Sequence, residues 1–227
     1  MPRPPREVHV ERSTGSAVAF HARDLPTGED LGGHLVVWDF VVDRPAVVLG
    51  SQQRTDVLDL EACGSAGVEV AHRRSGGGLV HLVPGEVLWV DVIVPTDHPS
   101  STSDIRGSMV WMGERWAAAL AHLGLTAGIA VHRGGMVASS WSDLICFAGI
   151  GPGEVLLDGH KLVGISQRRT RSAARFQCAV HLHADPTRVL PLLAAPLPPI
   201  DELPAVSVLA ADPAGRLVDA LVDELAV

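Results

Sequence analysis

Residues 146–169 read CFAGIGPGEVLLDGHKLVGISQRR, and they contain two strand-like runs joined by the pair Asp158 and Gly159. An Asp-Gly pair favours the tight turn of a β-hairpin because both residues tolerate a positive φ. Residues 176–183, FQCAVHLH, then alternate apolar and other side chains with the period of two expected of a half-exposed strand. This part of the chain therefore predicts a hairpin followed by a further strand.

Further strand-like runs precede this hairpin, and turn-forming pairs such as Pro84 and Gly85 separate some of them. The expected strands span residues 35–42, 45–50, 67–72, 78–83, 86–94 and 143–147. One long helix is expected over residues 104–123, where large apolar side chains recur at spacings of three and four, and Gly124 is suited to end it. Shorter helices are expected around 186–194 and 216–226.

These elements predict an α+β (mixed α/β) fold, in which a large mixed β-sheet is flanked by helices. Residues 1–34 are expected to form an irregular lead-in, because Pro and Gly interrupt any helical period there. The main domain is expected over residues 35–195. A Pro-rich connector and a short C-terminal helix are expected over 196–227.

The composition excludes several classes of protein. With 227 residues, of which 47% are hydrophobic and 19% charged, the chain is expected to be globular rather than disordered, collagen-like or coiled-coil. The densest apolar stretch, 86–95, is interrupted by Asp91 and is shorter than the ~20 residues of a membrane span. No apolar signal segment begins the chain, so a cytoplasmic location is expected. A net charge of −8 argues against nucleic acid as a partner.

A glycine-rich loop, Arg73-Arg74-Ser75-Gly76-Gly77-Gly78, lies between two predicted strands. Consecutive glycines let the backbone approach a ligand closely, and arginines donate hydrogen bonds to carboxylates or phosphates. The loop could therefore hold an acyl carbonyl or an acyl phosphate. The alternative is a glycine-rich bulge beside two solvated arginines. No Gly-Lys-Ser/Thr follows, so this is not a Walker loop.

Lys161 and Cys146 are the candidate catalytic residues. Lys161 enters a strand among apolar neighbours, where partial desolvation would favour its neutral form, and it could orient an acyl carbonyl or take up a proton. Cys146 precedes it by fifteen residues, and an ammonium group close to its sulfur would favour the reactive thiolate. The alternatives are a solvated hairpin lysine and a small buried thiol, which is also expected for Cys63 and Cys178. Three scattered cysteines make neither a disulfide framework nor a zinc site, and no metal site is predicted.

Five ordered motifs resemble the lipoate–protein ligase and octanoyltransferase family, whose catalytic domain is related to biotin–protein ligase. The motifs are PAVVLGSQQ (45–53), RRSGGGLVH (73–81), VLWVDVIVP (87–95), the stretch 146–169 and FQCAVHLHAD (176–185). The resemblance covers about 35–195 and implies a biotin/lipoate protein ligase-like catalytic domain. It implies that Lys161 contacts the carbonyl of a medium-chain acyl group. The acyl- or adenylate-binding set that it implies comprises Arg73, Arg74, Ser75, Gly76, Gly77, Gly78, His81, Glu154 and Gly164.

The two branches of this family differ in chemistry. Ligases use ATP to make an acyl adenylate, and they usually carry a His-x-x-Gly-Asn segment, whereas here Glu86 follows Gly85. Octanoyltransferases that take the acyl group from acyl carrier protein use a cysteine followed by Phe, as in Cys146-Phe147. The resemblance therefore favours a transferase that moves an octanoyl or lipoyl group onto a lysine of a lipoyl domain through a thioester at Cys146, with no cofactor required.

Two alternatives stay open: an ATP-dependent lipoate–protein ligase that requires ATP and Mg²⁺, and a non-catalytic acyl-binding relative. The expected partners are an acidic lipoyl domain, acyl carrier protein or both. A basic run could steer such a partner or could be ordinary solvated surface, and it comprises Arg168, Arg169, Arg171 and Arg175. Trp89 is expected where the family often has Tyr, and His181 and His183 are expected to face solvent rather than a metal.

Overall fold

The computed structural model describes residues 7–203, 205–209 and 211–227. Its main feature is a seven-stranded sheet in which β1 and β2 are parallel and every other neighbouring pair is antiparallel. In spatial order its strands are β1 (Val8–Gly15), β2 (Leu35–Val42), β6 (Val87–Pro95), β10 (Ala173–His181), β9 (His160–Arg169), β8 (Val155–Leu157) and β7 (Ile129–Val131). A second sheet has the order β4 (Glu69–His72), β3 (Ala46–Leu49) and β5 (Val80–Leu82).

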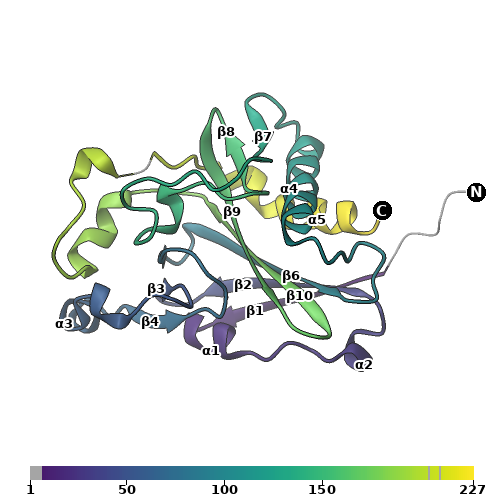
Figure 1. Cartoon of the computed structure of the whole chain (residues 1–227), viewed down its shortest axis with the longest axis horizontal. Coiled ribbons are helices and arrows are strands. Elements are labelled where there is room, and N and C mark those ends of the chain that lie inside the picture. Colours follow the sequence, from purple (N-terminus) through teal and green to yellow (C-terminus); the bar gives the residue numbers. More distant parts are fainter. Residues whose placement is uncertain (1–6, 204, 210) are drawn as a thin grey trace, which may run out of the picture.

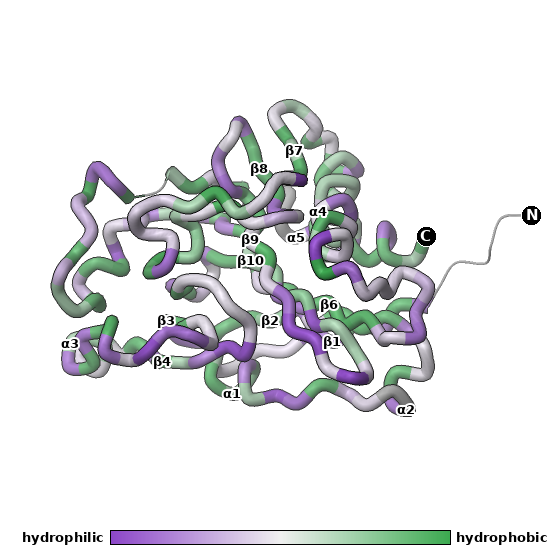
Figure 2. The backbone as a smooth tube through the Cα atoms, viewed as in Figure 1, coloured by the Kyte–Doolittle hydropathy of each residue, from purple (hydrophilic) through white to green (hydrophobic). Residues whose placement is uncertain are grey.

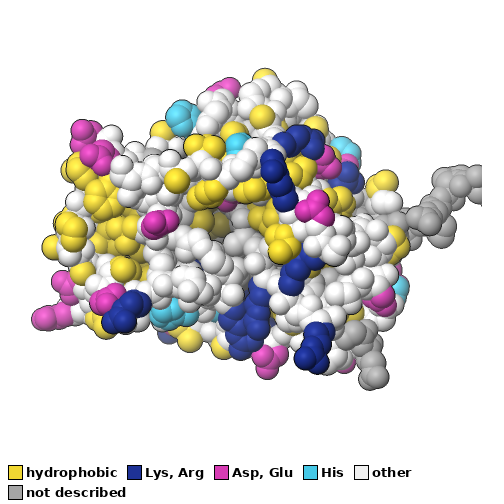
Figure 3. Space-filling model, in the orientation of Figure 1, with side chains coloured by type: hydrophobic (Ala, Val, Ile, Leu, Met, Phe, Trp, Pro, Cys, Tyr) yellow, Lys and Arg dark blue, Asp and Glu magenta, His cyan; other side chains and the backbone are white. Residues whose placement is uncertain are grey.

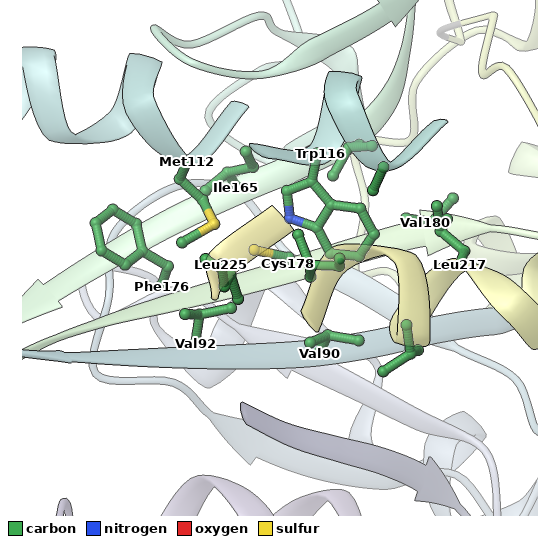
Figure 4. Packing of buried hydrophobic residues seen from close by; sticks show 14 of the residues in the cluster. Val90, Val92, Met112, Trp116, Ile165, Phe176, Cys178, Val180, Leu217 and Leu225 are labelled. Carbon is green, nitrogen blue, oxygen red and sulfur yellow. The ribbon is translucent and has the colours of Figure 1, made fainter. Parts of the chain in front are cut away.

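Helices α4 (Ile105–His122) and α5 (Ala211–Leu225) pack on each other and on one face of the large sheet (Figure 1). Trp116 and Met112 of α4 meet the central strands there, together with Leu217 and Leu225 of α5 (Figure 4). The central strands β6 and β10 are correspondingly apolar along much of their length (Figure 2). The remaining helices are α1 (Ala17–Ala22), α2 (Gly28–Leu31) and α3 (Leu60–Ser65), with short 3₁₀ turns at 55–57, 146–148, 186–192 and 200–202.

The opposite face of the large sheet packs against the small sheet and α1. Trp38, Phe40 and Trp89 project from β2 and β6 into this second core, where Phe20 of α1 stacks on Phe40 with ring centroids 4.2 Å apart. Val48 of β3 belongs to the same cluster. The large sheet is therefore covered on both faces, and the space between the two sheets is where a ligand can be enclosed.

The predicted hairpin is confirmed, with Asp158 at φ 51° and Gly159 at φ 83° between β8 and β9. The long helix and its end at Gly124, which has φ 80°, are also confirmed. The predicted strands at 35–42, 45–50, 67–72, 78–83 and 86–94 correspond to β2, β3, β4, β5 and β6. The C-terminal helix begins at residue 211, five residues before its predicted start.

Two expectations about single elements are wrong, and one element is of a different helix type. The lead-in is not irregular throughout, because residues 8–15 form β1 and residues 17–22 form α1. Residues 143–147 do not form a strand but turn into a 3₁₀ helix, since their apolar side chains pack under the glycine-rich loop. The short helix expected around 186–194 is present as a 3₁₀ helix over 186–192, which contains Pro191, a residue that cannot donate the hydrogen bond of an α-helix.

The strand over 176–183 is also not half-exposed. β10 lies in the middle of the sheet, and Gln177 is buried along with the apolar side chains that alternate with it. Gln177 tolerates burial because Ser75 donates a hydrogen bond to its Oε1 at 2.9 Å and His21 Nδ1 lies 3.3 Å from its Nε2.

The boundaries at residues 34 and 195 stay a prediction. β1 pairs along its whole length with β2, and α5 contributes to the core between the helices and the large sheet. Among the described residues, no helix combines the length and the apolar character needed to cross a membrane.

Candidate active site

An apolar pocket of about 450 Å³, partly open to solvent, lies between the two sheets. Strands β6, β9 and β10 form its floor, β3 and β5 form its roof, and α1 and the 3₁₀ turn at 146–148 close its sides. Figure 3 shows a hollow lined by hydrophobic side chains near the middle of this face. A pocket with this lining suits an aliphatic chain.

Three residues that pair directly across the strands form the floor. Trp89 of β6 is opposite Ala179 of β10, which is opposite Gly164 of β9. The two small residues leave the space that the pocket occupies. A Cβ atom at Gly164 would lie 3.0 Å from the ring of Phe147, so glycine allows this ring to close over the floor.

Cys146 lines the pocket in the turn that packs against the glycine-rich loop. Two backbone hydrogen bonds join turn and loop: Leu79 N–H donates to Leu144 O at 2.8 Å, and Cys146 N–H donates to Leu79 O at 2.9 Å. Gly78 permits this contact, because a Cβ atom there would lie 2.7 Å from Cys146 N. The glycine-rich loop therefore positions the candidate nucleophile.

Lys161 is buried beside the same turn, with 3% of its surface exposed. Its Nζ donates to Cys146 O at 2.8 Å and pairs with Glu154 Oε2 at 2.8 Å. Glu154 also accepts hydrogen bonds from Gly151 N–H at 2.7 Å and Ile165 N–H at 3.3 Å. The alternative of a solvated hairpin lysine is therefore excluded.

The Glu154 carboxyl titrates in an unusual environment. Burial raises its pKa above the ordinary value, although the Lys161 ammonium and the two backbone donors favour the charged form. A buried ion pair of this kind is held by its hydrogen bonds, and the loss of either partner leaves an uncompensated charge.

Arg73 donates hydrogen bonds to the backbone of the glycine-rich loop and of β3. Its guanidinium is buried and donates to Gly78 O at 2.7 Å, Gly76 O at 2.8 Å and Val48 O at 3.3 Å. Burial lowers the pKa of Arg73, and the nearby Cys146 sulfur partly opposes this shift. Most of the Arg73 donors therefore hold the loop, and the expectation that Arg73 donates to a carboxylate or phosphate stays a prediction.

The other loop residues divide between solvent and the interior. Arg74 is half-exposed and lies 3.5 Å from Asp24, while Gly76 and Gly77 are exposed. Ser75 is buried, and its Oγ lies 2.9 Å from both Ser166 Oγ and Gln177 Oε1. Among the loop residues, Arg74 and the outer glycines are therefore open to solvent, while Arg73 lines the apolar pocket.

Residues 33–221 match the lipoyl protein ligase A/B catalytic domain family. The chain belongs to this family. The resemblance stated from the five motifs is thereby confirmed at the level of the family, whereas the cysteine-bearing branch stays a prediction. No curated protein sequence matches this chain.

Solved structures share the fold of this lipoyl protein ligase A/B domain. A protein of Thermoplasma acidophilum with bound lipoic acid is 19% identical with a TM-score of 0.65, over 98% of this chain and 86% of that one. A lipoate-protein ligase A bound with ATP is 18% identical with a TM-score of 0.65, over 96% and 82%. A bi-partite lipoate protein ligase, described with its E2 lipoyl domain from T. acidophilum, is 17% identical with a TM-score of 0.65, over 98% and 84%. The predicted fold class is confirmed.

His81 does not join the other site residues of this lipoyl protein ligase A/B domain. It lines a second cavity of about 620 Å³, which shares Val80 and Phe147 with the apolar pocket but does not include Cys146. Burial and the nearby Arg188 cation lower the pKa of His81. Glu154 pairs with Lys161 and does not line the apolar pocket. Of the predicted binding set, the residues that line this pocket are Gly164 and Arg73.

His21 also lines the pocket, and no sequence pattern indicates it as a site residue. Its ring stacks on Trp89 with centroids 4.6 Å apart, and burial together with the Arg175 and Arg73 cations lowers its pKa to about 3. The residue lies in the stretch expected to be irregular. Its role depends on contacts with Trp89 and Gln177, which are distant in sequence, so no local pattern could reveal it.

His181 and His183 were expected to face solvent, but His181 is partly buried. Its ring packs against Phe147 at 4.4 Å, and burial lowers its pKa to about 4. Among the residues that the structure describes, the one His/Cys/Asp/Glu group close enough to hold a metal is Glu7, His9 and His34. None of these three lines the pocket of this lipoyl protein ligase A/B domain.

The predicted basic run is divided by the fold. Arg175 is buried against Asp91, with Nε donating to Oδ2 at 2.6 Å, and Arg169 hydrogen-bonds Ser108 at 2.8 Å. Arg168 and Arg171 stay at the surface. Burial and the Arg74 cation both lower the pKa of Arg168, so Arg74 and Arg168 lie close together.

Proposed function

We propose that this chain is an acyltransferase that moves an octanoyl or lipoyl group onto a lysine of a lipoyl domain through a thioester at Cys146. The observation that carries the proposal is that Cys146 lines an apolar pocket while the buried Lys161 ammonium is hydrogen-bonded to the backbone of the same residue. An aliphatic pocket, a thiol and a fixed cation are together what acyl transfer requires.

In the first step, Cys146 Sγ attacks the carbonyl carbon of an acyl thioester on a carrier. The new C–S bond forms, the donor C–S bond breaks, and the donor sulfur leaves with the proton given up by Cys146. An ammonium group has three N–H donors. Lys161 uses two of them, on Glu154 and on Cys146 O, and the third is suited to the acyl carbonyl oxygen.

In the second step, the uncharged amine of the acceptor lysine attacks the acyl carbon. The amide bond forms, the bond from the acyl carbon to Cys146 Sγ breaks, and the proton of the amine passes to the departing sulfur. The apolar lining of the pocket disfavours water beside the bound acyl chain, which favours attack by the amine over hydrolysis. A lipoyl domain as acceptor agrees with the T. acidophilum ligase described with its E2 lipoyl domain.

The rival function is an ATP-dependent ligation, and a neighbour of the same fold is bound with ATP. That reaction needs free cationic donors for phosphate. In this chain the Arg73 donors are engaged with backbone carbonyls, which leaves Arg74 as the loop's exposed cation. This arrangement supports the transferase over the ligase.

Intact-mass analysis after incubation with octanoyl acyl carrier protein tests the proposal. The wild-type chain and the control Cys63→Ala are expected to gain one octanoyl group and to pass it to a lipoyl domain, whereas Cys146→Ala is expected to gain none. If Cys146→Ala is still acylated, or transfers at the wild-type rate, the mechanism is wrong.

Two further outcomes would overturn the transferase. Pyrophosphate release that requires both lipoate and ATP would support the ligase. Acyl binding without modification of any lipoyl domain would support a non-catalytic relative.

A further inference from the structure

The apolar pocket has one reactive end and one closed end. Cys146 lines the pocket and is hydrogen-bonded through its carbonyl to Lys161, and Phe147 and the Lys161 side chain both approach Gly164, so the reactive end lies at the Gly164 side of the floor. Trp89 lies two strands away, on β6, with Ala179 between them. An acyl chain attached to Cys146 would therefore run across the strands, over Gly164 and Ala179, toward the Trp89 ring.

Trp89 is held on several sides and is only 4% exposed. Its ring stacks on His21 at 4.6 Å and meets Phe40 edge-on at 5.0 Å. Its Nε1–H donates to Asp91 Oδ1 at 2.8 Å. Aromatic contacts on two sides and a buried hydrogen bond prevent the indole from swinging aside.

The length of this path can be compared with that of an acyl chain. Neighbouring strands lie about 4.8 Å apart, so the path from Gly164 to Trp89 crosses about 10 Å. An extended aliphatic chain with bonds of about 1.5 Å advances roughly 1.3 Å per carbon, so eight carbons span roughly 9 Å. The floor is therefore as long as an octanoyl chain.

We propose that Trp89, fixed by His21 and Phe40, is the end wall that limits the acyl group to about eight carbons. This inference rests on the proposed function, because it places the carbonyl at Cys146. Ala179, at the middle of the path, is the complementary position: a large side chain there would block the pocket for all but short chains.

The test compares acyl carrier proteins loaded with chains of six to fourteen carbons, and the readout is the rate of acylation at Cys146. The wild-type chain is expected to be fastest near eight carbons. Trp89→Ala is expected to shift the optimum to ten or twelve carbons and to raise the dodecanoyl to octanoyl rate ratio at least tenfold. Ala179→Leu is expected to shift the optimum to six carbons.

Trp38→Leu is the matched control. Trp38 is a buried tryptophan of the same aromatic cluster, but it does not line the pocket. General loosening of the core would change the chain-length profile of Trp38→Leu and Trp89→Ala alike, and that result would overturn the assignment of the wall. An octanoyl optimum that stays in place in Trp89→Ala would also overturn it.

Calorimetry with free carboxylic acids of the same lengths separates this inference from the proposed function. Tightest binding at eight carbons, displaced to longer acids by Trp89→Ala, would support the wall even if Cys146 were never acylated. In that case the proposed transferase function would be wrong, and the assignment of Trp89 as the end wall would still be supported. Wild-type binding or acylation without a length optimum would overturn the wall, and the absence of both acid binding and acylation would overturn the wall and the transferase together.

Discussion

Gly78 is the residue at which the loop and the candidate nucleophile touch. A methyl group at this position would lie 2.7 Å from both Cys146 N and Ile145 C, which belong to the backbone and cannot rotate away. We expect Gly78→Ala to lower the free energy of unfolding by about 2 kcal/mol, as overpacking does, and to reduce acylation of Cys146 at least a hundredfold. Urea denaturation and intact-mass kinetics measure the two effects.

Gly76→Ala is the control for that substitution, because an added Cβ at Gly76 meets no atom within 4 Å. Its free energy of unfolding is expected to be close to that of the wild type, and its acylation rate is expected to stay within twofold of the wild-type rate. Equal behaviour of the two variants would show that the close approach of loop and turn does not position the sulfur.

The Glu154–Lys161 pair makes a separate prediction about stability. Removing one partner of a buried ion pair costs about 3–5 kcal/mol, since the other charge is left without compensation. Glu154→Gln is therefore expected to be strongly destabilised, and Glu154→Gln combined with Lys161→Met is expected to recover part of the loss. A double-mutant cycle from urea denaturation checks this, and strictly additive effects would contradict the coupling.

His21 predicts a loss of stability in acid. Burial and two arginines lower the pKa of its folded form to about 3, whereas an unfolded histidine titrates near 6.5. Between these values the unfolded chain binds a proton that the folded chain does not, so this stabilisation is complete above pH ~6.5 and is lost as the pH falls toward 3. From pH 7 to pH 5 the loss is about 2 kcal/mol.

The comparison of wild type with His21→Gln isolates this term, because the other titrating groups are common to both. The stability advantage of the wild type over the variant is expected to shrink by that amount between pH 7 and pH 5. Replacement of the exposed His72 by Gln serves as the control and should leave the pH dependence unchanged.

At the scale of elements, local patterns predicted those strands and helices whose side chains repeat with a clear period. The hairpin around Asp158 and Gly159 could be predicted from the sequence because its turn is specified by two adjacent residues. β1 could not, because it is an edge strand whose side chains are mostly exposed and show no apolar alternation. Residues 143–147 have the composition of a strand because they are buried, yet they wrap around Gly78 instead of pairing in a sheet.

For the candidate site, the sequence indicated the residues of one motif but not the contacts between distant residues. The motif that contains Cys146 and Lys161 left open whether the two residues face each other, and the hydrogen bond between Lys161 Nζ and Cys146 O shows that they meet through the Cys146 backbone. The contact between Gln177 and His21 joins residues 156 positions apart, and the donors of Arg73 point to carbonyls that only the folded loop brings together. Such roles depend on tertiary structure, and no short stretch of sequence encodes them.

Helix α5 is the element whose contribution is easiest to measure. Leu221 is fully buried in the core shared with α4 and the large sheet, whereas Asp223, two residues further on, is exposed. We expect Leu221→Ala to lower the free energy of unfolding by about 2–5 kcal/mol and Asp223→Ala to change it by less than about 0.5 kcal/mol. Similar values for both would show that α5 is not packed on the core.

At the scale of the whole molecule, the net charge of −8 contrasts with the cations on the face that carries the pocket. Arg74 and Arg168 lie close together there, and Figure 3 shows several arginine side chains on the same face as the hollow. An acidic carrier or lipoyl domain would be attracted to this face even though the protein as a whole repels it.

The double substitution of Arg74 and Arg168 by Glu is therefore expected to slow acyl transfer from an acidic carrier about tenfold at low salt. The difference is expected to fall below about twofold in 0.5 M salt, where screening shortens the reach of surface charges to a few ångströms. Stopped-flow or quenched assays at increasing salt measure this. Arg216→Glu is the control, because Arg216 is an exposed cation on α5, which covers the other face of the sheet. An equal loss of rate in Arg216→Glu would contradict specific steering.

The three cysteine thiols of this chain differ in burial. Cys63 and Cys178 are each 1% exposed, while Cys146 keeps a partly open position in the pocket wall. An alkylating reagent or a thiol-directed fluorophore added to the native protein will consequently label a single position. Without any engineered residue, the chain thus carries its own attachment point for a spectroscopic probe, and the signal would report directly on entry of an acyl group.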